Sequence, residues 1–189
     1  MSLYSEHPDY LGIYEHYGLL GPRALLGHCI HLSDRERSVM ADTDSVAVFC
    51  PTSNLFIGSG LFNEERTRKN GIRIAVATDI GGGTSYSMLR TMDEAYKVCQ
   101  LQNQNLPPLY AFYLMTLGNA KALGLETEIG TLEAGTEADI VVLDASATPA
   151  MALRMETVTT LAEELFVLQT LGDDRSVIET YVAGVAAKP

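Results

Sequence analysis

Short apolar runs alternate with amphipathic stretches over the first two thirds of the chain. Residues 24–31, 46–50 and 72–78 are mostly apolar runs, with a length and composition typical of buried strands. The stretches between and after them carry apolar residues at helical spacing, and we expect helices over residues 8–20, from Ser33 onward, around 63–70, over 85–103 and over 107–123. Strands that alternate with helices in this way indicate a parallel sheet covered by helices, which is the α/β class.

The pattern changes in the last third of the chain. Residues 129–144 are rich in glycine and β-branched side chains, a texture typical of short antiparallel strands. We expect a helix over residues 157–171 and a final strand over 176–184. The sequence therefore predicts two parts, residues 1–124 and residues 125–189.

Composition and charge exclude several classes of function. The 189 residues include 47% apolar side chains and carry a formal net charge of −11, so a nucleic-acid partner, which requires a basic surface, is not expected. No apolar run reaches the roughly eighteen residues that a membrane span needs, and the polar start shows no secretory signal pattern. The three cysteines are too widely spaced for a disulfide framework or a metal motif, which favours a reducing, cytoplasmic location.

Residues with catalytic or metal-binding chemistry follow each of the three predicted strands. His28 and His31 end the first run, a loop at 51–54 follows the second, and Asp79 follows the third. The carboxyl ends of parallel strands meet at one edge, where such folds bind ligands, so we expect these groups to lie close together. Asp79 precedes three glycines. A carboxylate in this place is either a helix N-cap or a group whose charge a metal ion or polar substrate compensates.

Several segments carry a family resemblance. They are Gly-His-Cys-Ile-His-Leu at 27–32, Cys-Pro-Thr-Ser-Asn at 50–54, Ala-Thr-Asp-Ile-Gly-Gly-Gly at 77–83, and the glycine-rich stretch at 123–143. Together they resemble the amidohydrolase superfamily, metal-dependent hydrolases built on a (β/α)8 barrel flanked by a small β-sandwich. Within it the likeness is greatest to the guanine deaminases, because of residues 54–60, 78–89 and 171–175.

The resemblance implies a fold and a reaction. Residues 1–124 would be the carboxyl-terminal part of a TIM barrel, strands six to eight, and residues 125–189 would return to the β-sandwich and add a helix. The substrate would be guanine, hydrolysed to xanthine and ammonia by a zinc-activated hydroxide. By resemblance, Asp79 would be the zinc ligand and general base, and His28 would hydrogen-bond the attacking hydroxide.

Three further residues, Asn54, Gly82 and Ser87, would lie at the purine by the same resemblance. Each also has a structural interpretation. Asn54 would brace the site or form an Asx turn, Gly82 would serve turn geometry, and Ser87 would cap a helix. Likewise, His28 would otherwise be a core histidine bonded to a backbone carbonyl.

The chain departs from the family pattern in its metal ligands. The family's His-x-His motif is absent, and a further metal-binding histidine with a catalytic glutamate is expected before Tyr10, where no suitable pair is present. We therefore expect a piece of such an enzyme that by itself holds zinc weakly and is inactive. Unpaired barrel edges would expose apolar surface, which predicts a homo-oligomer. The alternative functions are a related deaminase or chlorohydrolase of another purine or a triazine, and a non-catalytic self-associating fragment. The alternative fold is an open three-layer sheet.

Overall fold

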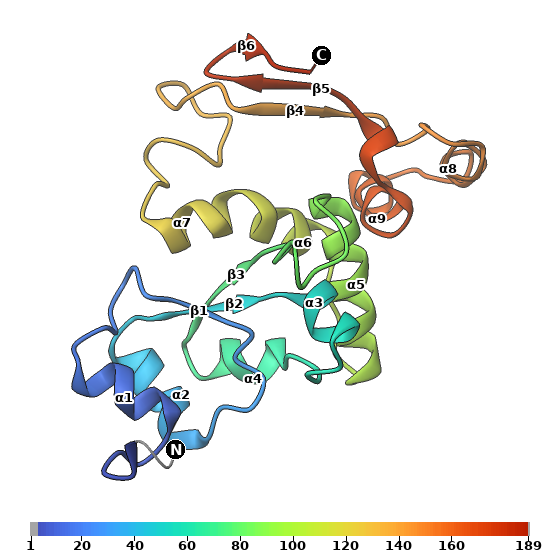
Figure 1. Ribbon diagram of the computed structural model, residues 1–189. Helices are drawn as coiled ribbons and strands as arrows, with labels where there is room; N and C mark the ends of the chain where they lie inside the picture. Colours follow the sequence, from blue (N-terminus) through green and yellow to red (C-terminus); the bar gives the residue numbers. More distant parts are fainter. Residues whose placement is uncertain (1–3, 189) are drawn as a thin grey trace.

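The computed structural model describes residues 4–188. Its first sheet contains β1 (Leu25–Gly27), β2 (Val46–Phe49) and β3 (Arg73–Val76), which are parallel and lie in the order β1-β2-β3 (Figure 1). All three correspond to predicted strands, and each is shorter than its apolar run. β2 and β3 are largely buried, whereas β1 lies at the edge with Leu25 45% exposed. The α/β class is therefore confirmed.

Helices precede, separate and follow these strands along the first part of the chain. They are α1 (Tyr10–His16), α2 (Asp34–Asp42), α3 (Pro51–Phe56), α4 (Glu64–Lys69) and α5 (Met88–Leu101). The start of α2 is fixed by a capping box, because Ser33 Oγ accepts from the Glu36 amide at 3.2 Å and the Glu36 carboxylate accepts from the Ser33 amide at 2.7 Å.

The loop predicted at residues 51–54 is wrong, since these residues form most of α3. Pro51 occupies the first turn, where its fixed φ and missing N–H suit a helix start. The Ser53 hydroxyl donates to the Cys50 carbonyl at 3.1 Å. Proline and small polar residues are common both in loops and in the first turn of a helix, and in this structure they form a helix.

The helix predicted over 107–123 is present as one continuous helical stretch. It consists of α6 (Pro108–Tyr113), a π-helical turn η2 (Leu114–Gly118) and α7 (Asn119–Leu123). Gly124 then takes φ +70°, a left-handed conformation that glycine adopts without steric cost, and ends the helix.

The side chain of Asn119 at the start of α7 contacts the outer edge of β3. Its Oδ1 accepts from the Val76 amide at 2.9 Å, and its Nδ2 donates to the Val76 carbonyl at 3.0 Å. The Ala77 amide donates to Phe49 in β2, so the backbone of Val76 faces away from β2. Asn119 therefore occupies hydrogen-bonding positions that a further strand would use.

The last part of the chain forms an antiparallel sheet and two helices. The strands are β4 (Ile140–Leu143), β5 (Val177–Val182) and β6 (Val185–Ala186), in the order β4-β5-β6, and the helices are α8 (Pro149–Met155) and α9 (Leu161–Leu171), followed by the 3₁₀ turn η3 (Asp174–Ser176). The predicted antiparallel pairing is confirmed, although its first strand begins only at Ile140. The pattern did not predict α8 or β6. α9 begins later than predicted, because Thr160 caps it in a second capping box.

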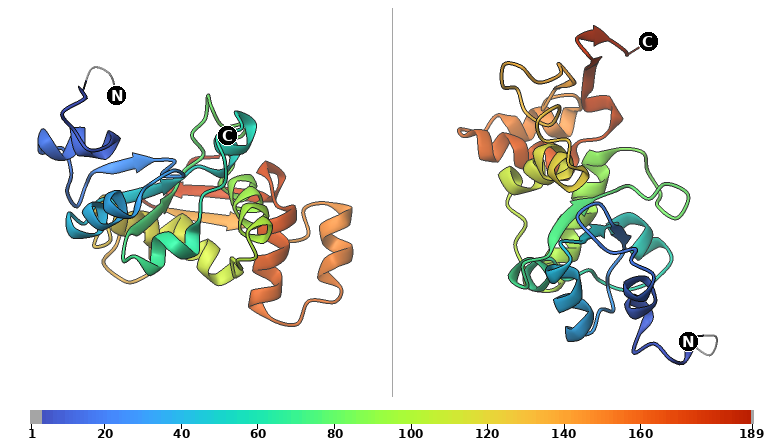
Figure 2. Two further views of the ribbon diagram at one scale, coloured as in Figure 1. Left: turned by 90° about the horizontal axis from the view of Figure 1, so that it is seen from below. Right: turned by 90° about the vertical axis from the view of Figure 1, so that its left-hand side faces the viewer.

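Helix α9 packs against α5 and α6 and ties the two parts together. Tyr96 and Phe166 meet edge to face with ring centroids 5.3 Å apart. One apolar cluster contains Leu89 from α5 together with Val167 and Leu168 from α9. The right-hand view of Figure 2 shows the antiparallel sheet and α1 at opposite ends of the molecule. The division into residues 1–124 and 125–189 stays a prediction.

Among the described residues, 4–188, no helix is both long enough and apolar enough to cross a bilayer.

Candidate active site

Three residues with metal-binding or acid–base chemistry meet at the carboxyl edge of the parallel sheet. His28 directly follows β1, Cys50 follows β2, and Asp79 lies three residues after β3. The register pairs Gly27 with Val48 and Phe49 with Val76, which brings the strand ends level. One ligand atom from each of the three side chains lies within 4.8 Å of the others. The expected meeting of strand ends is therefore present in the structure.

Two of these residues have a left-handed backbone. His28 has φ +70° and Asp79 has φ +48°, and Cys29 beside His28 has φ +50°. Such values are uncommon for residues other than glycine and are concentrated at functional sites. They also show that the strand predicted over 24–31 is wrong beyond Gly27. His31 is therefore not part of a strand, and its Nε2 lies 2.9 Å from the Ser59 carbonyl, to which it is bonded.

The imidazole of His28 is hydrogen-bonded to the side chain of Asn54. The Nδ1 atom of His28 lies 2.8 Å from Oδ1 of Asn54, whereas the His28 side chain is 46% exposed. Asn54 comes from α3 and is only 1% exposed. Its side chain thus reaches the histidine from the interior rather than from the open edge.

The turn after Asp79 is closed by one backbone contact and one side-chain contact. The Gly83 amide donates to the Asp79 carbonyl, and the hydroxyl of Thr52 donates to the Thr78 carbonyl at 3.0 Å. A Cβ at Gly83 would overlap with the Thr78 carbonyl oxygen, so glycine is required there. A Cβ at Gly82 would lie 3.3 Å from Oδ2 of Asp79. Because glycine has no Cβ, the carboxylate stays accessible from that side. Thr52 is the residue that sequence reasoning missed, since only its place in the 50–54 motif marked it.

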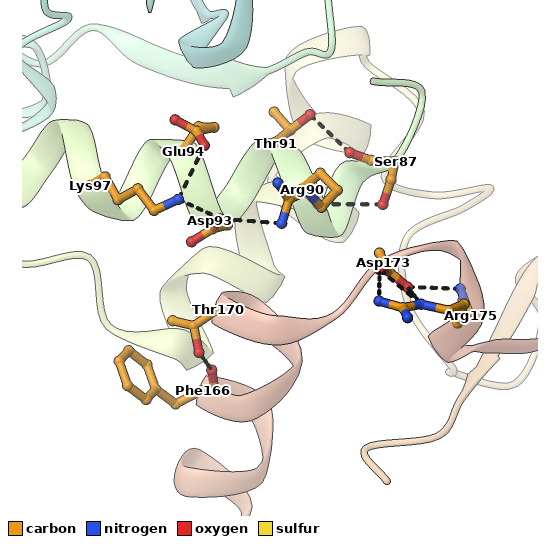
Figure 3. A network of polar contacts seen from close by, with 10 residues as sticks. All are labelled: Ser87, Arg90, Thr91, Asp93, Glu94, Lys97, Phe166, Thr170, Asp173 and Arg175. Carbon is orange, nitrogen blue, oxygen red and sulfur yellow. Dashed lines mark hydrogen bonds and ion pairs between the residues drawn. The ribbon is translucent and has the colours of Figure 1, made fainter. Parts of the chain in front are cut away.

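Ser87 lies at the start of α5, where it caps the helix. Its Oγ accepts from the Arg90 amide at 3.3 Å, and its carbonyl accepts from the Thr91 hydroxyl at 3.0 Å (Figure 3). One turn further along, buried Asp93 is neutralised by Lys97 at 2.7 Å. The capping interpretation of Ser87 therefore has direct structural support. A polar cavity of about 280 Å³ opens beside this helix start, lined by Thr52, Thr84, Ser85, Arg90, Glu94, Asp173 and Asp174.

The donor set at the sheet edge fits part of a zinc site. Nε2 of His28 and Oδ2 of Asp79 are 3.9 Å apart, too far for a direct hydrogen bond and close enough for both groups to contact one water molecule between them. Cys50 is a poorer donor, because burial, with the nearby Asp79 carboxylate, raises the pKa of its thiol and only the thiolate binds zinc well. Among residues 4–188 this is the single group of three or more such side chains, and within it Asp79 is the one strong candidate ligand, with His28 at most a weak second.

The sequence as a whole matches a known family. Residues 2–187 fit the pattern of the Amidohydrolase family. The chain belongs to this family. This amidohydrolase chain is 49% identical over 183 residues to guanine deaminase of Escherichia coli (strain K12), a match that covers 97% of the chain and 42% of the relative. The solved structure of E. coli guanine deaminase is similar with a TM-score of 0.97 at 48% identity, over 99% of this chain and 44% of that one.

Two further solved structures similar to this chain contain a bound molecule. Guanine deaminase from C. acetobutylicum, solved with guanine in its active site, matches with a TM-score of 0.85 at 28% identity, over 98% of this chain and 44% of that one. An adenosine deaminase from Xanthomonas campestris with bound zinc matches with a TM-score of 0.79 at 25% identity, over 93% and 39%. The predicted family and its TIM-barrel fold are confirmed. The chain spans less than half the length of the relatives it matches.

Proposed function

We propose that this chain supplies the carboxyl-terminal part of the active site of a guanine deaminase, with β1, β2 and β3 as barrel strands six, seven and eight and β4–β6 as part of the sandwich. The observation that carries the proposal is the convergence of His28 and Asp79 at one sheet edge, with Nε2 and Oδ2 3.9 Å apart. The 49% identity to the E. coli enzyme supports guanine as the substrate over other purines and triazines.

The proposed reaction converts guanine and water into xanthine and ammonia. Zinc, when bound, would make water a stronger nucleophile near neutral pH. Asp79 would be one of its ligands and would take the proton from the attacking water, for which its 39% exposed side chain is accessible. His28 would hydrogen-bond the same water through Nε2 and later stabilise the oxygen on the tetrahedral carbon.

The other residues would shape the place of the purine. Gly82 lies against the Asp79 carboxylate and lacks a side chain, so its backbone can approach a flat ring closely. Ser87 would hold the start of α5 next to this turn. Asn54 is buried and contacts His28, so we propose that it braces the site.

A chimeric enzyme tests the function. The segment of E. coli guanine deaminase that aligns with this chain would be replaced by residues 4–188, and guanine conversion would be followed by xanthine absorbance. We expect the chimera to deaminate guanine and Asp79→Asn to abolish turnover, whereas the exposed-site control Asp42→Asn keeps it. A folded, zinc-loaded chimera that deaminates adenine or a triazine but not guanine contradicts the proposal.

For the chain by itself we propose weak zinc binding and no turnover, because it supplies Asp79 and at most a weak second ligand in His28, whereas a tight zinc site has three or four ligands. Metal analysis after dialysis against a chelator measures this, and zinc retained at one ion per chain would contradict it. We also propose that the chain self-associates through the exposed edge of β1. A monodisperse monomer in light scattering would argue against association.

A further inference from the structure

The contact between His28 and Asn54 has a feature that packing does not explain. Oδ1 of Asn54 faces Nδ1 of His28 at 2.8 Å, but Nδ2 of the same amide is buried without a hydrogen-bond partner among the described residues. A buried N–H without a partner destabilises the folded state. An apolar side chain of similar size would avoid that penalty, so the amide oxygen must have a use that an apolar residue cannot supply.

We infer that Asn54 is a positioning residue that fixes the tautomer of His28, an inference that rests on the proposed deaminase function. An amide oxygen is only an acceptor, so the ring nitrogen that faces it, Nδ1, carries the proton. In the neutral ring the lone pair is then on Nε2. This atom faces the sheet edge, 3.9 Å from the carboxylate of Asp79.

Asn54 is well placed to orient the ring, because its own backbone is fixed. The backbone amide of Asn54 donates to the Cys50 carbonyl at 3.1 Å, and its backbone carbonyl accepts from the Ser59 amide at 2.9 Å. His28, by contrast, is 46% exposed and lies on a left-handed backbone, so packing alone does not hold its ring. The bond to Asn54 is the direct restraint on the imidazole.

The same bond is compatible with both charge states of the imidazole. Nδ1–H donates to Asn54 whether Nε2 is free or protonated. The ring therefore keeps its orientation through the proton transfer. Nε2 first accepts a hydrogen bond from the second proton of the attacking water, whose first proton goes to Asp79. It then takes this second proton as the oxyanion forms and donates it in a hydrogen bond to that oxygen. With the opposite amide orientation, Nδ2 would donate to Nδ1, and Nε2 would carry the proton from the outset.

Nitrogen NMR of the ¹⁵N-labelled full chain distinguishes the two tautomers. At about pH 8.5, where an ordinary histidine is neutral, we expect Nδ1–H at His28, and His31 provides an internal control because its Nε2 donates to the Ser59 carbonyl. Asn54→Leu removes the acceptor and should convert His28 to Nε2–H without changing His31. Asn54→Asp keeps an oxygen acceptor and should retain Nδ1–H, with the Nδ1 proton resonance shifted downfield.

Kinetics of the chimera give a second, independent measurement. A residue that acts through His28 should change kcat, so Asn54→Leu is expected to lower kcat about 10- to 100-fold with little change in KM. A mainly raised KM would mean that Asn54 contacts the purine, and it would overturn the inference.

The remaining outcomes are also decisive. Nε2–H at His28 in the wild-type chain, or an unchanged tautomer in Asn54→Leu, overturns the inference. Should Asn54→Leu not fold, an Nδ1 proton that does not move in Asn54→Asp overturns it, and a downfield shift supports it. An inactive chimera together with Nδ1–H would refute the deaminase function alone, whereas an active chimera with Nε2–H would refute only the role of Asn54.

Discussion

Replacing Gly83 by alanine tests whether the turn that presents Asp79 is sterically closed. The new Cβ would overlap with the carbonyl oxygen of Thr78 and would lie 2.7 Å from Oγ1 of Thr52 and 3.0 Å from the carbonyl oxygen of Asp79. Two of these three atoms belong to the backbone, which cannot swing away as a flexible side chain does. The turn must therefore open to accept the methyl group.

The size of the effect follows from what the opening breaks. The Thr78 carbonyl can move only by losing its 3.0 Å hydrogen bond from Thr52, which contributes about 1 kcal/mol. Overpacking at a closed site adds about 1–3 kcal/mol. We expect Gly83→Ala to lower the free energy of unfolding by about 2–4 kcal/mol.

Urea unfolding followed by far-UV circular dichroism measures the change, because the chain has no tryptophan to report by fluorescence. Gly27→Ala is the matched control at the same sheet edge. Its Cβ would meet no atom within 4 Å and its φ is not left-handed, so we expect no loss and a gain of up to about 1 kcal/mol. A Gly83→Ala variant within about 0.5 kcal/mol of the wild type would refute the reasoning.

Three further changes are predicted to alter stability. Asp9→Asn should cost about 1 kcal/mol near pH 7, because the fork of Arg35 binds the Asp9 carboxylate at 2.6 and 2.7 Å. Arg35 lowers the pKa of Asp9 below its unfolded value, so this contribution is complete above about pH 5 and disappears as the pH falls through the folded pKa. Asn119→Ala should cost about 2 kcal/mol through the two lost bonds to Val76. Thr160→Ala should cost about 1 kcal/mol by removing the cap of α9.

Each of these changes has its own control. A difference between wild type and Asp9→Asn that does not shrink as the pH falls below about 4 would contradict the role of the carboxylate charge. For Asn119, a variant as stable as the wild type in urea would mean that β3 does not depend on the side-chain bonds. Thr160→Ser keeps the hydroxyl and should retain wild-type stability in thermal unfolding, whereas a loss as large as that of Thr160→Ala would exclude capping as the cause.

The sequence predicted the strands of the parallel sheet because each is a buried apolar run between helical stretches. It overestimated their lengths, since the apolar run at 24–31 gives no sign that the backbone turns left-handed at His28. Pro51 was ambiguous for a similar reason, because it suits a turn and a helix start equally. Local pattern thus determined which segments are strands, while tertiary contacts determined where they end.

The sequence predicted where the candidate site lies better than it predicted the role of each residue in that site. Asp79 and His28 stood out because ionisable residues follow apolar runs, and the edge they share follows from parallel pairing. The bond from His28 to Asn54 and that from Thr52 to Thr78 each join residues 26 positions apart. No local pattern specifies such contacts, so they became visible only in three dimensions.

The amide of Asn119 makes the two rims of the parallel sheet unequal. On one side β1 has no neighbouring strand among the described residues. At the other rim, the side-chain amide of Asn119 makes the two hydrogen bonds to Val76 of β3 that a neighbouring strand would otherwise make. A sheet with two open rims can recruit copies head to tail without limit and grow into a fibre. With one rim blocked, two copies that join through β1 leave no equivalent rim for a third. The self-association proposed through β1 would therefore stop at a closed pair, and Asn119→Ala would allow further copies to join at β3.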